Sequence, residues 1–217
     1  MDFAAARLNM VESQVRPNRV TDPGVIASFE KVARECFLPE ALQGIAYVDE
    51  DVPLSKDRYL MEPRVLGRLL QAAAPRPDDI ALDIACGTGY AAAVMAGLAA
   101  TVVGLESDEA LVARANEILN EQGVDNAVVV QGDLRQGYPK QGPYNVILIE
   151  GMVSAVPTEI TDQLVDGGRL LTVIADASGL GRATEIRKHG KQLSQRTLFD
   201  ANLKALPEFA ATPGFVF

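Results

Sequence analysis

The stretch LDIACGTGY, residues 82–90, combines an apolar run, one acid and a turn of very small residues. Gly87 and Gly89 have no Cβ, so a ligand can approach the backbone closely and the chain can adopt unusual dihedral angles. The turn reads Gly87-x-Gly89-x-x-Ala92, which fits the loose fingerprint of dinucleotide sites. A tight strand-to-helix turn that binds nothing has the same pattern, so both interpretations stay open at this point.

Three acids sharpen this interpretation, because each ends or follows an apolar run. Asp83 lies four residues before Gly87, Glu106 ends TVVGLE, and Asp133 follows VVVQG. A dinucleotide would place its anionic pyrophosphate beside Asp83, which would repel it, whereas an amino-acid ammonium group would be attracted. Glu106 could accept hydrogen bonds from ribose hydroxyls, and Asp133 could reach an adenine amino group. The set favours S-adenosylmethionine over NAD, although single acids could be solvated strand ends and an NAD-dependent oxidoreductase remains an alternative.

Short apolar strands that alternate with helices must position these residues. Strands are expected at 80–85, 101–106, 127–133, 144–150 and 167–175, and helices at 90–99, 107–123 and 156–165. This alternation predicts an α/β fold with a mostly parallel sheet covered on both faces. Ligands of such sheets bind beyond the carboxyl ends of the strands, where the acids and the glycine turn fall.

The flanking segments predict a helical N-terminal part and an antiparallel end. A helix is expected over 20–37, with Asp22 as its cap and Pro23 at its first position, and another over 62–74. Residues 184–199 resemble two strands around a turn at His189-Gly190. We therefore expect a single domain with a cap and substrate region at 1–77, a cofactor-binding core at 78–175, and a hairpin and tail at 176–217.

Composition excludes several classes of function. The 217 residues include 20 Lys and Arg against 29 Asp and Glu, a net charge of −9, which disfavours nucleic-acid binding. Cys36 and Cys86 have no metal-ligand spacing and cannot form a disulfide framework, so no metal is expected. No secretory signal or membrane-length apolar run is apparent, so a soluble, cytoplasmic protein is expected.

Five segments in order along the chain resemble protein-L-isoaspartate O-methyltransferases: MVESQVRP, LDIACGTGYAAAVMA, VVGLESDEAL, VVVQGDLRQGYPKQGPYNVILIEG and VPTEITDQLVDGGRLL. The resemblance runs from about residue 10 to 205. It implies a Rossmann-like class I methyltransferase fold, a three-layer sandwich with an antiparallel C-terminal hairpin and an N-terminal helical cap. It also implies S-adenosyl-L-methionine as cofactor, and a damaged protein or peptide with an isoaspartyl carboxylate as the partner that is methylated.

The resemblance implies a cofactor-binding set in which Asp83 and the glycines hold the methionine end, Glu106 the ribose and Asp133 the adenine. The full set is Asp83, Ala85, Gly87, Thr88, Gly89, Glu106, Ser107, Gly132, Asp133 and Leu134.

The substrate side departs from the family. Members usually carry Ser-Gln-Pro where this chain has Met61, Glu62 and Pro63, and small residues where it has Glu150 and Met152. Methionine offers no donor to a carboxylate, and a glutamate would repel one. An alignment slip that makes the methionines ordinary core residues is the alternative. Met61, Glu62 and Glu150 are the candidate catalytic positions.

Three functions therefore stay open. The first is methylation of isoaspartyl carboxylates, which are ionised at neutral pH and need no general base. The second is a methyltransferase of the same fold that acts on another substrate. The third is an inactive module that binds S-adenosylmethionine or S-adenosylhomocysteine.

Overall fold

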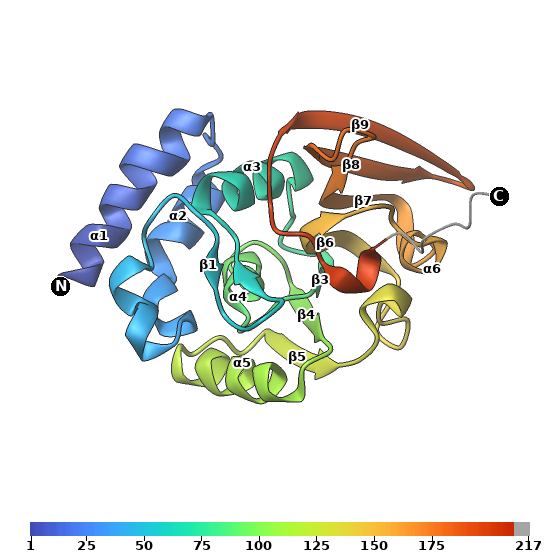
Figure 1. Ribbon diagram of the computed structural model, residues 1–217. Coiled ribbons are helices and arrows are strands. Elements are labelled where there is room, and N and C mark those ends of the chain that lie inside the picture. Colours follow the sequence, from blue (N-terminus) through green and yellow to red (C-terminus); the bar gives the residue numbers. More distant parts are fainter. Residues whose placement is uncertain (211–217) are drawn as a thin grey trace.

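A seven-stranded sheet runs through the computed structural model, which describes residues 1–210 (Figure 1). Its order is β5-β4-β3-β6-β7-β8-β9, and β5, β4, β3, β6 and β7 are mutually parallel. The strands are β3 (Ile80–Ile84), β4 (Thr101–Glu106), β5 (Ala127–Gln131), β6 (Tyr144–Val153), β7 (Leu164–Ala175), β8 (Gly181–His189) and β9 (Gln192–Asp200). The antiparallel pair β8–β9 forms the predicted hairpin at the sheet edge, and the predicted α/β fold class is confirmed.

Both faces of the sheet are buried because helices and turns cover them. Leu82 and Ile84 point into one apolar cluster, and Ala81, Val102 and Leu148 point into the other. The helices are α1 (Phe3–Met10), α2 (Pro23–Lys31), α3 (Pro63–Ala73), α4 (Tyr90–Ala96), α5 (Glu109–Glu121) and α6 (Thr158–Thr161). Helix α3 packs on β7 and β8, and α4 and α5 pack on the β3–β5 side.

The expected helix caps are present. The Asp22 side chain accepts a hydrogen bond from the Val25 backbone N–H, with Pro23 at the first helical position. Of the two cap residues predicted for the helix after β4, Asp108 has this role. These local signals set the starts of α2 and α5.

Several element boundaries differ from the expectation, three of them near the candidate site or in the flanking helices. The helix predicted over 20–37 ends at Lys31, because Val32 is extended and the chain then forms a short turn at Arg34–Phe37. The segment 156–165 contains only the short helix α6, since its apolar end already belongs to β7. Strand β6 was expected to end at residue 150 and continues to Val153, so Glu150 lies within the strand.

The segment between α2 and α3 forms a small antiparallel pair, β1 (Val52–Pro53) and β2 (Tyr59–Leu60), drawn in teal in Figure 1. The division into cap, core and tail regions stays a prediction, and residues 211–217 of that tail lie outside the described residues.

Within 1–210, no helix has both the length and the apolarity that a membrane span requires. The same residues contain no cluster of His, Cys, Asp and Glu that could hold a metal ion.

Candidate active site

Three acids project from one face of the sheet at the carboxyl ends of neighbouring strands. Asp83 is paired in register with Gly104 of β4 and Leu148 of β6. Glu106 and Glu150 lie two residues beyond those partners, and side chains two apart on a strand share a face. All three acids are buried, and Asp83 and Glu106 have no exposed surface. We call these acids, with the turn 85–89, the strand-end site.

The turn after β3 has the backbone that its sequence predicts. Gly87 and Gly89 have φ angles of +53° and +87°, a region that residues with a Cβ rarely adopt. Ala85 also has a positive φ, 61°, although it carries a Cβ. A strained residue of this kind persists only where its surroundings fix it, and such residues cluster at functional sites.

Glu106 is the best-connected acid of the strand-end site. Its Oε1 accepts hydrogen bonds from the backbone N–H groups of Ser107 (2.7 Å) and Asp108 (3.2 Å). Its Oε2 accepts one from the N–H of Gly87 at 3.1 Å, which ties the glycine turn to β4. Both oxygens also accept from Nε of Arg58, at 3.0 and 2.9 Å. The acceptors expected for a ribose are therefore engaged by a side chain of this protein.

Arg58 lies between β1 and β2 and links them to the C-terminal segment. Its Nη2 donates to Oε1 of Glu208 at 2.6 Å and to the Ser107 hydroxyl at 3.0 Å. Burial disfavours its charge, but the hydrogen bonds to Glu208 and Glu106 outweigh burial and raise the pKa of Arg58 above its ordinary value. Leu54, on the same segment, lies 2.6 Å from where a Cβ on Gly87 would be. The segment 52–60 thus covers the glycine turn.

Asp83 and Glu150 form a buried pair of carboxyl groups. Neither oxygen of Asp83, nor Oε1 of Glu150, has a hydrogen-bond partner among residues 1–210. Burial raises the pKa of Asp83 to about 8, and the charge of Glu106 adds to this. Burial and the neighbouring Asp83 charge raise the pKa of Glu150 well above its ordinary value. Two ionised carboxylates offer each other no donor, so the stable arrangement near neutral pH is one in which the pair holds a proton.

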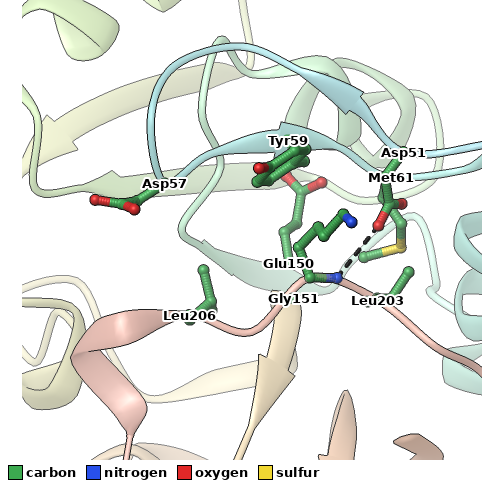
Figure 2. A pocket seen from close by; sticks show the side chains of 9 residues that line it. Asp51, Asp57, Tyr59, Met61, Glu150, Gly151, Leu203 and Leu206 are labelled. Atoms are coloured by element: carbon green, nitrogen blue, oxygen red, sulfur yellow. Dashed lines mark hydrogen bonds between the residues drawn. The ribbon is translucent and has the colours of Figure 1, made fainter.

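Met61 and Glu150 line one small cavity of about 10 Å³, shown in Figure 2. We call it the Met61 cavity. Its walls come from the segment of β1 and β2, the end of β6 and the chain after β9. The lining residues are Asp51, Asp57, Tyr59, Met61, Glu150, Gly151, Leu203, Lys204 and Leu206. Its volume holds about one water molecule. The structure thus brings two of the three candidate catalytic residues together.

Glu62, the third candidate, lies apart from the other two. It lines a different cavity, of about 300 Å³, between α3 and the β8–β9 edge. Its carboxylate forms an ion pair with Arg64 at 3.1 Å, and its backbone N–H donates to Asp51. Burial raises the pKa of Glu62, with the charge of Asp51 adding to the effect. Glu62 is therefore a buried residue at the start of α3 that does not line the Met61 cavity.

The remaining cofactor residues of the prediction lie around the turn and the ends of β4 and β5. The Thr88 hydroxyl donates to the buried carbonyl of Phe37 at 2.6 Å, which anchors the turn to the N-terminal region. Asp133 is exposed and accepts from the Arg135 N–H, and the Gly132 N–H donates to the Glu106 carbonyl. Leu134 is buried in the core.

Sequence reasoning missed Arg58, Arg34 and Lys204. Arg34 has no exposed surface, donates to the carbonyls of Ala46 (2.6 Å) and Met61 (2.8 Å), and lies over the Tyr90 ring. An arginine within the apolar run VARECF was the available signal for a buried cation. No local signal identifies Arg58, because its partner Glu106 is 48 residues away.

The residues of the strand-end site fit an adenosyl cofactor. Asp83 offers two buried oxygens without partners, which suits a ligand ammonium group, and the glycine turn leaves backbone bare beside it. Glu106 can accept from a ribose once Arg58 releases it. The cofactor-binding residues stay a prediction, and a ligand could use Glu106 only if the segment 52–60 moves away from the turn.

The chain is similar in sequence to known proteins of one family. The profile of the family described as Protein-L-isoaspartate(D-aspartate) O-methyltransferase matches residues 6–202. A protein-L-isoaspartate O-methyltransferase from Herpetosiphon aurantiacus is 34% identical over 205 residues, 94% of this chain and 90% of its own. One from Methanoregula boonei is 35% identical over 168 residues, 77% of each chain.

Solved structures show the same fold. A protein-L-isoaspartate O-methyltransferase superposes over 92% of this chain with a TM-score of 0.82 and 24% identity, and this chain spans 65% of its length. A beta-aspartate methyltransferase from Plasmodium falciparum, in complex with S-adenosyl-L-homocysteine, has a TM-score of 0.79 and 21% identity, covering 96% of this chain and 99% of its own. The predicted Rossmann-like methyltransferase fold is confirmed.

Proposed function

The chain belongs to the protein-L-isoaspartate(D-aspartate) O-methyltransferase family, and from that premise we propose that it methylates the side-chain carboxylate of isoaspartyl residues in damaged proteins. Membership confirms the enzyme class and cofactor predicted from the sequence, a methyltransferase that uses S-adenosylmethionine. The match over residues 6–202 carries the proposal, because it includes the substrate side as well as the cofactor turn. Protein repair in the cytoplasm, with a protein or peptide as partner, is part of the same proposal.

When bound, S-adenosylmethionine would supply a methyl group from its cationic sulfur to an acceptor oxygen, and S-adenosylhomocysteine would leave. Asp83 would hold the ammonium group of the methionine end beside the Gly87 turn, Glu106 the ribose and Asp133 the adenine. The buried side chains of Met61, Leu203 and Leu206 would exclude water from an acceptor bound at the Met61 cavity. Exclusion of water favours a step in which two opposite charges neutralise. The chain therefore acts mainly by positioning its two substrates.

A radiolabelled methyl-transfer assay with an isoaspartyl peptide tests the proposal. We expect a labelled product that base hydrolyses, as a carboxyl ester does, and no labelling of the matched aspartyl peptide. Calorimetry with S-adenosylhomocysteine, run in parallel, reports the cofactor site separately. Cofactor binding without labelled peptide would refute the isoaspartyl acceptor and leave the methyltransferase site intact.

A second candidate is methylation of a neutral or cationic acceptor by the same fold. Its support is the charge of the Met61 cavity, where Asp51, Asp57 and Glu150 lie together and Lys204 is the lone lining cation of the described residues. Labelling of an amine acceptor, with a product stable to base, would favour it over the isoaspartyl acceptor.

A further inference from the structure

Glu150 is a buried carboxyl group that lines the Met61 cavity. The residue is 7% exposed, and its Oε1 has no hydrogen-bond partner among the described residues. It lies on β6 beside Asp83 of β3, at the point where the strand order reverses. Ligands of open α/β sheets bind at that point.

The groups that face Glu150 favour its neutral form. Asp83 on β3 and Glu106 on β4 add negative charge from the sheet, and Arg34 on the turn after α2 opposes them. Across the cavity, Asp51, Asp57 and Tyr59 come from the β1–β2 segment and Lys204 from the chain after β9. Burial is the largest influence on Glu150, followed by the charge of Asp83, and both raise its pKa. Both influences favour the protonated carboxyl, which can donate a hydrogen bond.

We propose that Glu150 is the residue that binds the methyl acceptor: its carboxyl group, at the wall of the Met61 cavity, donates a hydrogen bond to the acceptor carboxylate. This inference rests on the proposed carboxyl methylation. It resolves the apparent conflict between an acidic substrate and an acid at this position, because a neutral carboxyl does not repel a carboxylate. Burial elsewhere in proteins likewise keeps carboxylic acids neutral so that they act as donors.

Lys204 contributes the positive charge at the same cavity. Its side chain is exposed, its ammonium lies 5.8 Å from the Tyr59 ring centroid, and its backbone N–H donates to Asp51 at 3.3 Å. The acceptor carboxylate would then have an inner donor at Glu150 and an outer cation at Lys204. Since the cavity holds about one water, the acceptor reaches Glu150 only after the β1–β2 segment or the chain 203–206 moves outward.

Two variants, Glu150→Gln and Glu150→Ala, distinguish a role of Glu150 as hydrogen-bond donor from a role as ionised base. Glu150→Gln keeps a donor of the same shape and removes the titration, so kcat/KM for an isoaspartyl peptide should stay within about threefold of wild type at pH 7. Glu150→Ala removes the donor and should lower kcat/KM by about 10- to 100-fold, the scale of a hydrogen bond to a charged group. Glu159→Gln, an exposed glutamate on α6, is the matched control and should change nothing.

The pH profile gives the second measurement. The proton on Glu150 is present below its raised pKa and lost above it, so wild-type activity should fall as pH rises through that value, and the fall should be absent in Glu150→Gln. Calorimetry with S-adenosylhomocysteine checks that each variant keeps its fold and cofactor site. If the wild type methylates but Glu150→Gln is as inactive as Glu150→Ala, Glu150 acts as a base and the inference is wrong. If the wild type binds the cofactor but leaves isoaspartyl peptides unlabelled, the proposed function fails and this inference fails with it.

Discussion

Replacement of Arg58 by Met is expected to strengthen the binding of S-adenosylhomocysteine, although it removes a buried ion pair. Arg58 donates to both oxygens of Glu106 and must withdraw before a ribose can use them. Without the arginine, the ligand no longer displaces those bonds. We expect the binding free energy to become more favourable by about 1–2 kcal/mol, which lowers Kd about 5- to 30-fold. This is the usual net value of hydrogen bonds to a charged group, which the ligand no longer has to break by displacing Arg58.

The same variant should be less stable, but not unfolded. Glu106 retains the N–H groups of Gly87, Ser107 and Asp108 after Arg58 is lost, so its charge is still hydrogen-bonded. We expect a loss of about 1–3 kcal/mol in the free energy of unfolding, which for a chain of this size lowers Tm by about 2–10 °C.

Isothermal titration calorimetry and thermal unfolding measure both quantities on one preparation. Arg114→Met is the control, because Arg114 forms an exposed ion pair with Glu117 on α5. Its Kd should match that of wild type. Equal or weaker cofactor binding in a folded Arg58→Met variant would refute the competition between Arg58 and the ribose.

Two further substitutions test the strand-end site. Asp83→Asn should weaken cofactor binding by about 1–3 kcal/mol yet raise the free energy of unfolding at pH 7 by up to about 4 kcal/mol, because the native pKa of about 8 makes folding take up a proton. The contribution of Asp83 to stability is complete below pH 4 and is lost as pH rises through 8, so urea unfolding should show a steeper decline over this range in wild type than in the variant. Gly87→Ala places a Cβ 2.6 Å from Leu54 at a φ of +53°, and should cost about 1–2 kcal/mol of stability, measured by urea unfolding. An unchanged urea midpoint in that variant would mean that the turn relaxes freely.

The sheet could be predicted because its signals are local. Apolar runs of strand length, separated by capped helices, determined five parallel strands, and the turn at His189-Gly190 determined the hairpin. The helix over 20–37 was too long in the prediction because its apolar spacing continues past Lys31. Arg34 ends that helix by reaching the carbonyls of Ala46 and Met61, contacts that only the folded chain brings together.

The cofactor side could be predicted further than the substrate side. Asp83 and Glu106 follow from their place on apolar strands, whereas Arg58 depends on a segment folding back over the turn. Glu150 was expected at the last position of a strand, and the structure extends β6 to Val153 and places Glu150 next to Asp83. What the sequence did not show is its burial, which favours the neutral form of the carboxyl group.

The charges of the strand-end site lead to a last prediction, which concerns protons. Glu106 is neutralised by Arg58, whereas Asp83 and Glu150 share a buried face with no arginine bonded to them among the described residues. Before a ligand binds at pH 7, Asp83 is mostly protonated, because burial raises its pKa to about 8. The ammonium group of S-adenosylhomocysteine favours the ionised form, so binding should release up to about one proton.

Calorimetry in buffers of different ionisation enthalpy measures the number of protons released. The observed heat of binding changes linearly with the ionisation enthalpy of the buffer, and the slope is that number. The slope should correspond to about one released proton at pH 7 and should fall toward zero by pH 9, where Asp83 is already ionised. The Asp83→Asn variant should release no proton when it binds the ligand. A buffer-independent heat at pH 7 in the wild type would mean that Asp83 is ionised before the ligand arrives. The proton of the pair would then lie on Glu150 alone, which would donate it in a hydrogen bond to the ionised Asp83 before the ligand binds.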